Sequence, residues 1–157
     1  MVTHDRLRVL FLCTGNSARS QMAEAILRQL SKGRADVFSA GSLPAQAIHP
    51  AAKAVLEETF GIDTAGLFPK SMAEFFGQRF DYVITVCDNA AEQCPVFPGD
   101  PQRIHWSFED PALQPTAEAQ RSAAEQVATG LTERLRIWMS LPEVRTRLET
   151  ELRGADR

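Results

Sequence analysis

One stretch near the start of the chain restricts the fold more than any other. Residues 6–13 read RLRVLFLC and have the nearly continuous hydrophobicity of a strand buried in a parallel sheet. Residues 14–17 (TGNS) end this run, and apolar side chains then recur at helical spacing from Met22 to Leu30, with Gly33 just beyond. A strand, a tight loop and a helix in this order are typical of the first unit of an α/β domain.

Strands and helices are predicted to alternate along the rest of the chain. The pattern predicts strands at residues 37–40, 81–86 and 103–106, and helices at 50–58, 72–76, 116–139 and 143–152. On the helix at 116–139, one face carries the apolar residues Ala123, Val127, Leu131, Leu135 and Trp138. The alternation predicts an α/β fold with a parallel sheet of about four strands, with its ligand site beyond their carboxyl ends.

Length and charge narrow the remaining possibilities. A chain of 157 residues has the size of one domain, so we expect a single domain over residues 1–157, with its core at about 6–139 and a C-terminal helical extension at 142–157. The net charge of -3 argues against nucleic-acid binding, which needs a basic face. The first apolar run is too short to span a membrane, so we expect a cytoplasmic location. We also expect a monomer.

The loop at residues 13–20 (CTGNSARS) has the composition of an anion-binding cradle that carries a nucleophile. Small residues let successive backbone N–H groups face one anion, and the following helix adds the positive end of its dipole. The same field favours the thiolate of Cys13, which makes an inert buried cysteine the weaker reading. Arg19 can bind two oxygens with its planar fork, and Ser20 can donate to the Cys13 sulfur. The predicted oxyanion-binding residues are Thr14, Gly15, Asn16, Ser17, Ala18, Arg19 and Ser20.

The run CTGNSARSQMAEA closely resembles the phosphate-binding loop and first helix of the low-molecular-weight protein tyrosine phosphatases and of the arsenate reductases that share their fold. The resemblance extends from Val9 to about Met139, and it implies a three-layer sandwich around a four-stranded parallel sheet. It also makes Asp110, in HWSFEDPA, the general acid, with Glu109 a weaker candidate. By itself, an Asp-Pro pair is more often a turn.

The other two cysteines suggest redox chemistry. With Cys13 they make an odd number, which argues against a structural disulfide framework, and the histidines show no zinc-binding spacing, so we expect no metal and no cofactor. Cys87 follows the strand at 81–86, and Cys94 comes seven residues later, a spacing that allows a disulfide if the loop rearranges. The segment ITVCDNAAEQCPVFPG resembles the redox segment of thioredoxin-coupled arsenate reductases. Two unrelated cysteines are the alternative.

Together these resemblances imply an arsenate reductase that serves arsenic detoxification. Cys13 would attack arsenate while Asp110 protonates the leaving oxygen, Cys87 would then attack Cys13 and release arsenite, and Cys94 would attack Cys87. Thioredoxin or a similar thiol reductant would reduce the final Cys87–Cys94 disulfide. Two alternatives are a phosphatase that hydrolyses phosphate monoesters and a redox sensor. We also expect residual phosphatase activity in a reductase. The residues that follow Pro111 are Ala112 and Leu113, which provide no aromatic ring to pack against a substrate's phenyl group. This favours a small inorganic oxyanion as the substrate.

Some relatives bind a potassium ion beside this loop through residues that match Asn16, Glu24 and Ser39. Here Lys70 lies in the segment that contributes an acidic residue in those relatives, so we expect its ammonium group in the place of the ion. We expect structural roles for His49 and His105, and core positions for Phe75, Phe76 and Phe80.

Overall fold

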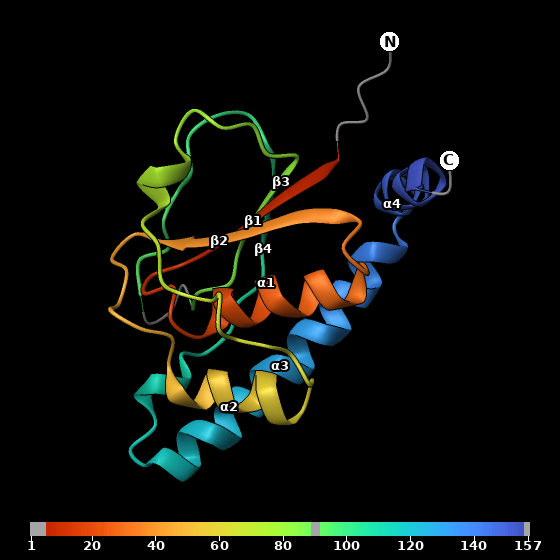
Figure 1. Ribbon diagram of the computed structural model, residues 1–157. Helices are drawn as coiled ribbons and strands as arrows, with labels where there is room; N and C mark the ends of the chain where they lie inside the picture. Colours follow the sequence, from red (N-terminus) through yellow and green to blue (C-terminus); the bar gives the residue numbers. More distant parts are fainter. Residues whose placement is uncertain (1–5, 89–91, 156–157) are drawn as a thin grey trace.

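The first apolar run forms a central strand of a parallel sheet. The computed structural model describes residues 6–88 and 92–155. In it, β1 (Leu7–Cys13) is almost entirely buried between β2 (Ala35–Gly41) and β3 (Tyr82–Thr85), and β4 (Gln102–His105) completes the order β2-β1-β3-β4 (Figure 1). All pairings are parallel, which confirms the predicted sheet. Strand β2 is longer than predicted because β1 pairs with it along its whole length.

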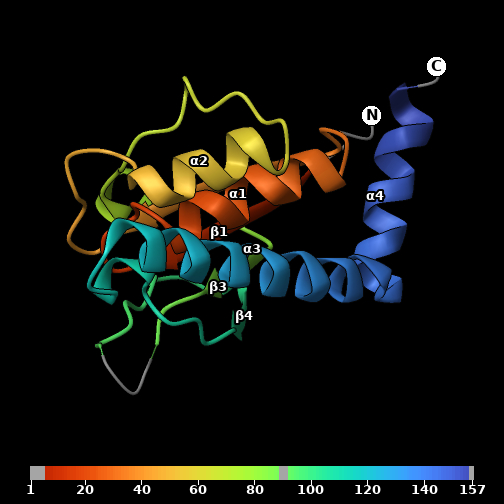
Figure 2. The same ribbon diagram turned by 90° about the horizontal axis from the view of Figure 1, so that it is seen from below.

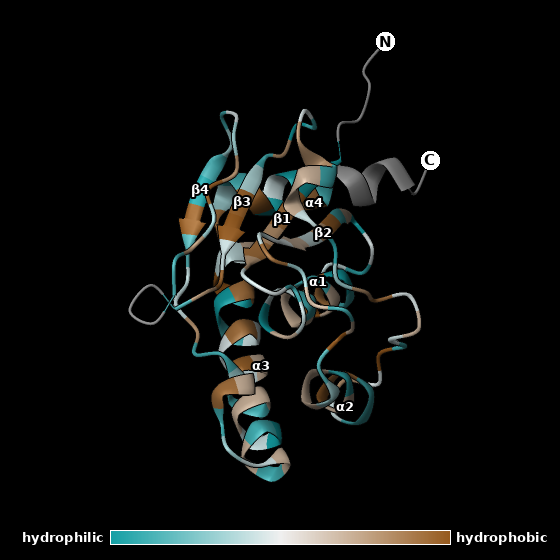
Figure 3. Ribbon diagram, turned by 90° about the vertical axis from the view of Figure 1, so that its left-hand side faces the viewer, coloured by the Kyte–Doolittle hydropathy of each residue, from teal (hydrophilic) through white to brown (hydrophobic). Residues whose placement is uncertain are grey.

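Three helices cover one face of the sheet. Helices α1 (Arg19–Leu30) and α3 (Ala117–Ser140) lie side by side against it, and α2 (Pro50–Glu58) packs on both (Figure 2). Hydrophobic residues gather on the strands and along part of α3 (Figure 3). The predicted apolar face of α3 is confirmed with one correction: Ala124 is buried, whereas Ala123 is only half-buried, because the helix packs with a slightly different phase.

The opposite face is covered by a short 3₁₀ helix, η1 (Met72–Phe75), and by the segments around it. Phe38, Phe75 and Phe80 pack there with ring centroids 5.6–5.9 Å apart. These layers confirm the predicted sandwich. The prediction that Phe76 is a core residue is wrong: it is 51% exposed, because its extended backbone ends η1 and turns the side chain outward.

The last helix, α4 (Pro142–Ala155), lies at the end of the sheet opposite the strands' carboxyl ends (Figures 1 and 2). Its residues Val144 and Leu148 are buried in the main core. Arg147 reaches Asp81, just before β3, at 3.3 Å. The extension is therefore packed onto the domain. Within the described parts of the chain, no helix combines the length and hydrophobicity that a membrane span requires.

We expect Asp81→Asn to lower the free energy of unfolding by about 1–2 kcal/mol at pH 7, because hydrogen bonds to a charged group are lost. The Asp81 carboxylate accepts from the backbone N–H of Arg8 at 2.8 Å, and Arg79 and Arg147 contact it. Burial opposes ionisation, but these partners outweigh it and hold the pKa of Asp81 below its usual value. The carboxylate's contribution is therefore present above about pH 4 and is lost as the pH falls through the folded-state pKa.

Urea unfolding of wild type and Asp81→Asn at pH 7 and at pH 3 measures this contribution. The gap between the two proteins should shrink at the lower pH. Asp100→Asn, at an exposed loop position, is the matched control and should change stability little at either pH. A gap that is unchanged at pH 3 would contradict the assigned role of the ionised carboxylate.

Candidate active site

In the loop between β1 and α1, three peptide carbonyls point away from the loop interior and are hydrogen-bonded to the segment that follows β2. The carbonyl oxygens of Thr14, Gly15 and Ser17 accept hydrogen bonds of 2.8–2.9 Å from the backbone N–H groups of residues 43, 45 and 49. In a trans peptide the C=O and the following N–H point in opposite directions. The N–H groups that follow these carbonyls therefore face the interior of the loop, as the predicted anion cradle requires.

Two residues make this loop conformation possible. Asn16 has φ = 49°, the left-handed conformation that asparagine tolerates better than most residues. Gly41, at the end of β2, lies so close to the loop that a Cβ atom there would be 2.5 Å from the carbonyl oxygen of Thr14. A glycine on the neighbouring strand thus lets the cradle pack directly against the sheet.

Cys13 lies at the base of the cradle with donors aimed at its sulfur. Its side chain is 1% exposed, and its Sγ accepts from the backbone N–H of Asn16 at 3.2 Å. Ser20 Oγ lies 2.8 Å from the same sulfur and itself accepts from Asn16 Nδ2 at 2.7 Å. The Ser20 hydroxyl is therefore free to donate its proton toward Cys13. Both contacts stabilise a thiolate.

Arg19 extends its guanidinium across the mouth of the cradle. The side chain is only 3% exposed, and Nη1 donates to the carbonyl of Phe108 at 3.0 Å. Nη2 lies 3.6 Å from Asp110 Oδ2. Burial alone would lower the pKa of Arg19, but the hydrogen bond to Glu92 and the charges of Cys13, Asp110 and Glu92 raise it. Arg19 therefore remains a fixed cation in this site.

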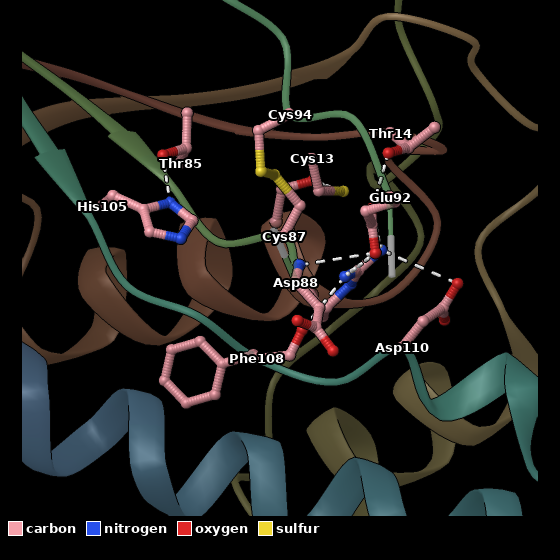
Figure 4. The surroundings of a disulfide bond; sticks show 12 residues. Cys13, Thr14, Thr85, Cys87, Asp88, Glu92, Cys94, His105, Phe108 and Asp110 are labelled. Carbon is pink, nitrogen blue, oxygen red and sulfur yellow. Dashed lines mark hydrogen bonds and ion pairs between the residues drawn. A yellow bond between two sulfur atoms is a disulfide. The ribbon is translucent and has the colours of Figure 1, made fainter. Parts of the chain in front are cut away.

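Asp110 both begins a turn and places its carboxyl group at the cradle, the two readings that the sequence left open. Its Oδ1 accepts from the backbone N–H of Ala112 at 2.9 Å and begins the short helix η2 (Pro111–Leu113), so the Asp-Pro pair does form a turn. Its Oδ2 faces Arg19, which brings the carboxyl group to the cradle (Figure 4). Glu109 is exposed.

The three cysteines gather at the carboxyl end of the sheet. Cys87 follows β3, and the N–H of Val86 donates to the carbonyl of Leu12, so Cys87 and Cys13 leave neighbouring strands at the same edge. Cys87 and Cys94 form a disulfide with a Cα–Cα distance of 6.0 Å, and Cys13 is a free thiol (Figure 4). Cys87 is fully buried, whereas Cys94 is only half-buried.

Glu92 completes the site, and sequence reasoning missed it. Its carboxylate forms a two-bond pair with Arg19, at 2.7 Å and 3.0 Å, and accepts from the Thr14 hydroxyl at 2.5 Å. Burial opposes its ionisation, but these donors outweigh burial and lower the pKa of Glu92. The only signal in the sequence was an acidic residue inside CDNAAEQC, with no pattern that pointed to Arg19.

A second missed feature supports the loop that carries Asp110. The ring of Phe108 packs against Gly130, in the middle of α3, where a Cβ atom would lie 2.8 Å from the ring. The same residue's carbonyl accepts from Arg19. Gly130 therefore sets how closely this loop approaches the helix. An isolated glycine in a helical pattern was the available signal.

Lys70 directs its ammonium group toward Glu24, one of the three residues that match the potassium-binding positions. Its Nζ is 3.9 Å from Glu24 Oε1 and donates to the carbonyl of Phe68 at 2.9 Å. Glu24 also accepts from Ser39 Oγ at 2.6 Å, and Asn16 Nδ2 donates to that hydroxyl. Burial and the charge of Arg28 lower the pKa of Lys70, and Glu24 partly offsets them.

The two histidines have structural contacts. His49 begins α2, where its Nδ1 accepts from the backbone N–H of Ala51 at 3.1 Å. The ring of His105 lies 2.7 Å from the Thr85 hydroxyl, between neighbouring strands. These contacts agree with the structural roles expected for both residues.

Comparison with known proteins identifies the family of the chain. Residues 8–153 match the family model described as low molecular weight phosphotyrosine protein phosphatase. An arsenate reductase of Oceanobacillus iheyensis is 35% identical over 136 residues, which cover 86% of this chain and 96% of the relative.

Solved structures give the same picture. The arsenate reductase of Archaeoglobus fulgidus superposes with a TM-score of 0.66 at 30% identity, over 81% of this chain and 98% of that one. A thioredoxin-dependent arsenate reductase of Corynebacterium glutamicum gives a TM-score of 0.65 at 32% identity, over 88% of this chain and 63% of that one. The chain therefore belongs to the low molecular weight phosphotyrosine protein phosphatase family, and arsenate reductases are among its relatives.

Proposed function

We propose that this protein reduces arsenate to arsenite with Cys13 as the nucleophile and Cys87 and Cys94 as a disulfide relay. The observation that carries the proposal is the Cys87–Cys94 disulfide at the sheet edge that also holds the cradle of Cys13. Hydrolysis of a phosphate ester needs one cysteine and no redox pair, whereas reduction of arsenate needs two electrons from thiols.

The proposed reaction begins in the cradle. The loop N–H groups and Arg19 hold the oxyanion, with Thr14, Gly15, Asn16, Ser17, Ala18 and Ser20 forming the wall. The Cys13 thiolate forms a sulfur–arsenic bond, and Asp110 protonates the hydroxyl that leaves as water. Asp110 suits this role because its second oxygen already caps η2, which fixes the orientation of the carboxyl group.

Two thiol exchanges follow. The Cys87 thiolate attacks the Cys13 sulfur, the sulfur–arsenic bond breaks, and its electron pair stays on arsenic, which leaves as arsenite. Cys94 then attacks Cys87, which releases Cys13 as a thiolate and leaves the Cys87–Cys94 disulfide seen here. Two electrons and two protons from an external dithiol restore the resting thiols.

Thioredoxin or a similar thiol protein is the reductant we propose. Cys94 is the more exposed residue of the disulfide, so we propose that the incoming thiolate attacks there. The thioredoxin-dependent neighbour described above supports this assignment. We place the reaction in the cytoplasm, because cycling of a disulfide needs a reducing compartment, and propose arsenic detoxification as its purpose.

Phosphatase activity is the second candidate function. The cradle, Arg19 and Asp110 are the parts that phosphate ester hydrolysis requires, and the family takes its name from that reaction. The residues after the acid, Ala112 and Leu113, supply no aromatic wall for a phenyl ring. We therefore expect only residual hydrolysis of aryl phosphates.

A coupled assay distinguishes the two functions. The protein is mixed with thioredoxin, thioredoxin reductase and NADPH, and NADPH consumption is followed with and without arsenate. Arsenate-dependent consumption supports the reductase. No consumption, together with brisk hydrolysis of an aryl phosphate by the same sample, would show that the chain is a phosphatase.

Gly130→Ala should impair turnover although it lies outside the cradle. In an ordinary helix this change stabilises a protein by about 1 kcal/mol. Here the new methyl group meets the Phe108 ring and displaces the loop that carries Asp110. We expect no gain in stability and a loss of about tenfold in kcat, since misplaced catalytic groups are costly.

Thermal unfolding and steady-state arsenate reduction measure both effects. Thr129→Ala, at the exposed neighbouring position, is the control and should leave kcat unchanged. The double variant with Phe108→Leu should recover part of the loss, because the smaller side chain makes room for the methyl group. A Gly130→Ala protein that is both more stable and fully active would disprove the supporting role.

A further inference from the structure

Glu92 occupies the fork formed by the two terminal nitrogens of Arg19. Both oxygens of its carboxylate pair with the two terminal nitrogens of the guanidinium, at 2.7 Å and 3.0 Å. This two-bond arrangement is the one that arginine uses for carboxylates and phosphates alike. One of these oxygens also accepts from the hydroxyl of Thr14, at the rim of the cradle. A side chain of the protein thus uses the donors that would hold a bound oxyanion.

Glu92 lies in the segment whose ends the Cys87–Cys94 disulfide joins. Glu92 lies between Cys87 and Cys94 in the sequence, two residues before Cys94. Its backbone N–H donates to the carbonyl of Asp88 at 2.9 Å, and its carboxylate accepts from the N–H of Asp88 at 3.4 Å. The glutamate that pairs with Arg19 therefore lies beside Asp88 and close in sequence to both cysteines of the disulfide (Figure 4).

An oxyanion and the Glu92 carboxylate would compete for Arg19. Glu92 takes the fork formed by Nη1 and Nη2, Nη1 also donates to the Phe108 carbonyl, and Asp110 already brings one negative charge to Nη2. A further anion in the cradle would lie close to a carboxylate that its hydrogen bonds keep ionised, and like charges at such distances repel strongly. An oxyanion therefore binds more tightly once Glu92 has left this fork.

We propose that Glu92 is an internal competitor of the oxyanion, inserted by the Cys87–Cys94 disulfide and withdrawn when that disulfide is reduced. The inference rests on the proposed function, in which the disulfide is the last state of each cycle. Its consequence is an ordered cycle: the oxidised enzyme, which lacks the thiols to complete a reduction, does not take up a new oxyanion. Reduction opens the ring, frees the Glu92 backbone and returns the Arg19 fork to the substrate.

Binding of inorganic phosphate to the two redox forms tests the proposal, because phosphate has the shape of arsenate and accepts no electrons from thiols. Isothermal titration calorimetry is run on the full chain with the disulfide intact and after reduction by an excess of a dithiol. We expect the oxidised protein to bind phosphate at least about tenfold more weakly, because its competent state is scarcely populated. In oxidised Glu92→Gln, which lacks the charge, the affinity should return to within about threefold of the reduced protein's.

Glu133→Gln, the same change on the exposed side of α3, controls for net charge and should retain the redox dependence of the wild type. Circular dichroism and thiol counting confirm that each sample is folded and in the stated redox form. Equal phosphate affinities of the two wild-type forms would overturn the proposal. A weak affinity that persists in oxidised Glu92→Gln would also overturn it, because the disulfide would then act without Glu92.

These outcomes are independent of the coupled assay. If arsenate turnover is absent but phosphate affinity depends on the redox state through Glu92, the proposed competition by Glu92 is supported and the proposed arsenate reduction is refuted. If arsenate turnover is present and phosphate affinity is the same in both redox forms, the proposed arsenate reduction is supported and the proposed competition by Glu92 is refuted.

Discussion

Cys94→Ser should complete one turnover and then stop. The fully reduced variant still holds the thiols of Cys13 and Cys87, which together supply the two electrons for one arsenate. We therefore expect about one arsenite per protein molecule in a rapid first phase. Steady-state consumption of NADPH with thioredoxin should fall by roughly a thousandfold, because thiol exchange depends on access to the sulfur under attack.

The burial of the sulfurs explains the size of this effect. After one turnover the variant holds a Cys13–Cys87 disulfide, and these two residues are 1% and 0% exposed in the structure. Cys94 is the cysteine with substantial exposure, and it extends from the sheet edge on the segment that follows β3. Without it, the oxidised bond lies beneath the surface, and a protein reductant cannot bring its own thiolate into line with either sulfur.

Rapid quenching with separation of arsenite from arsenate measures the first phase, and mass spectrometry after alkylation identifies the disulfide that accumulates. Cys13→Ser is the companion variant and should release no arsenite at all, because it lacks the attacking thiolate. Sustained cycling by Cys94→Ser at the wild-type rate would refute the relay, since Cys94 would then have no part in regeneration.

The elements of the fold were predictable wherever local pattern and long-range packing agree. The continuous hydrophobicity of β1 could only suit a strand buried on both faces, and the glycine- and asparagine-rich turn after Cys13 had few alternatives to a cradle. The boundaries of β2 were predicted less well, because the ladder with β1 sets its length and leaves little trace in its own sequence. The prediction that Phe76 is buried was wrong because the backbone of Phe76 itself is extended at the end of η1, and this local conformation decides where the side chain points.

The contacts that the sequence could not predict join residues far apart in the chain. Glu92 meets Arg19 across 73 positions, and neither residue's neighbours encode the other. The packing of Phe108 on Gly130 likewise depends on how the acid-bearing loop lies against α3. Cys13 and Arg19 could be named from the composition of their own loop, and Asp110 could be named because the family resemblance carried it. Glu92 could not, because no pattern in the sequence connects it with Arg19.

Arg19→Lys should reduce kcat/KM for arsenate by about a hundred- to a thousandfold, the range seen when one preorganised oxyanion donor is removed. Lysine keeps the positive charge, so the change isolates geometry from charge. An ammonium group cannot bind two oxygens in one plane and also reach the Phe108 carbonyl, which Arg19 does at 3.0 Å. The loss should appear in kcat as well as KM, because the fork aligns arsenate with the Cys13 sulfur in addition to binding it.

The measurement is steady-state arsenate reduction over a range of arsenate concentrations, with a thermal melt to confirm folding. Arg145→Lys, an exposed arginine on α4 that pairs with Glu149, is the matched control and should change kcat/KM by less than about twofold. Arg19→Lys also tests the proposed competition by Glu92. Without the planar fork, the Glu92 carboxylate loses its two-bond partner. The oxidised and reduced forms of this variant should therefore bind phosphate with similar, weak affinity. An Arg19→Lys enzyme that keeps wild-type kcat/KM would mean that charge alone holds the oxyanion, and the fork would then serve only Glu92.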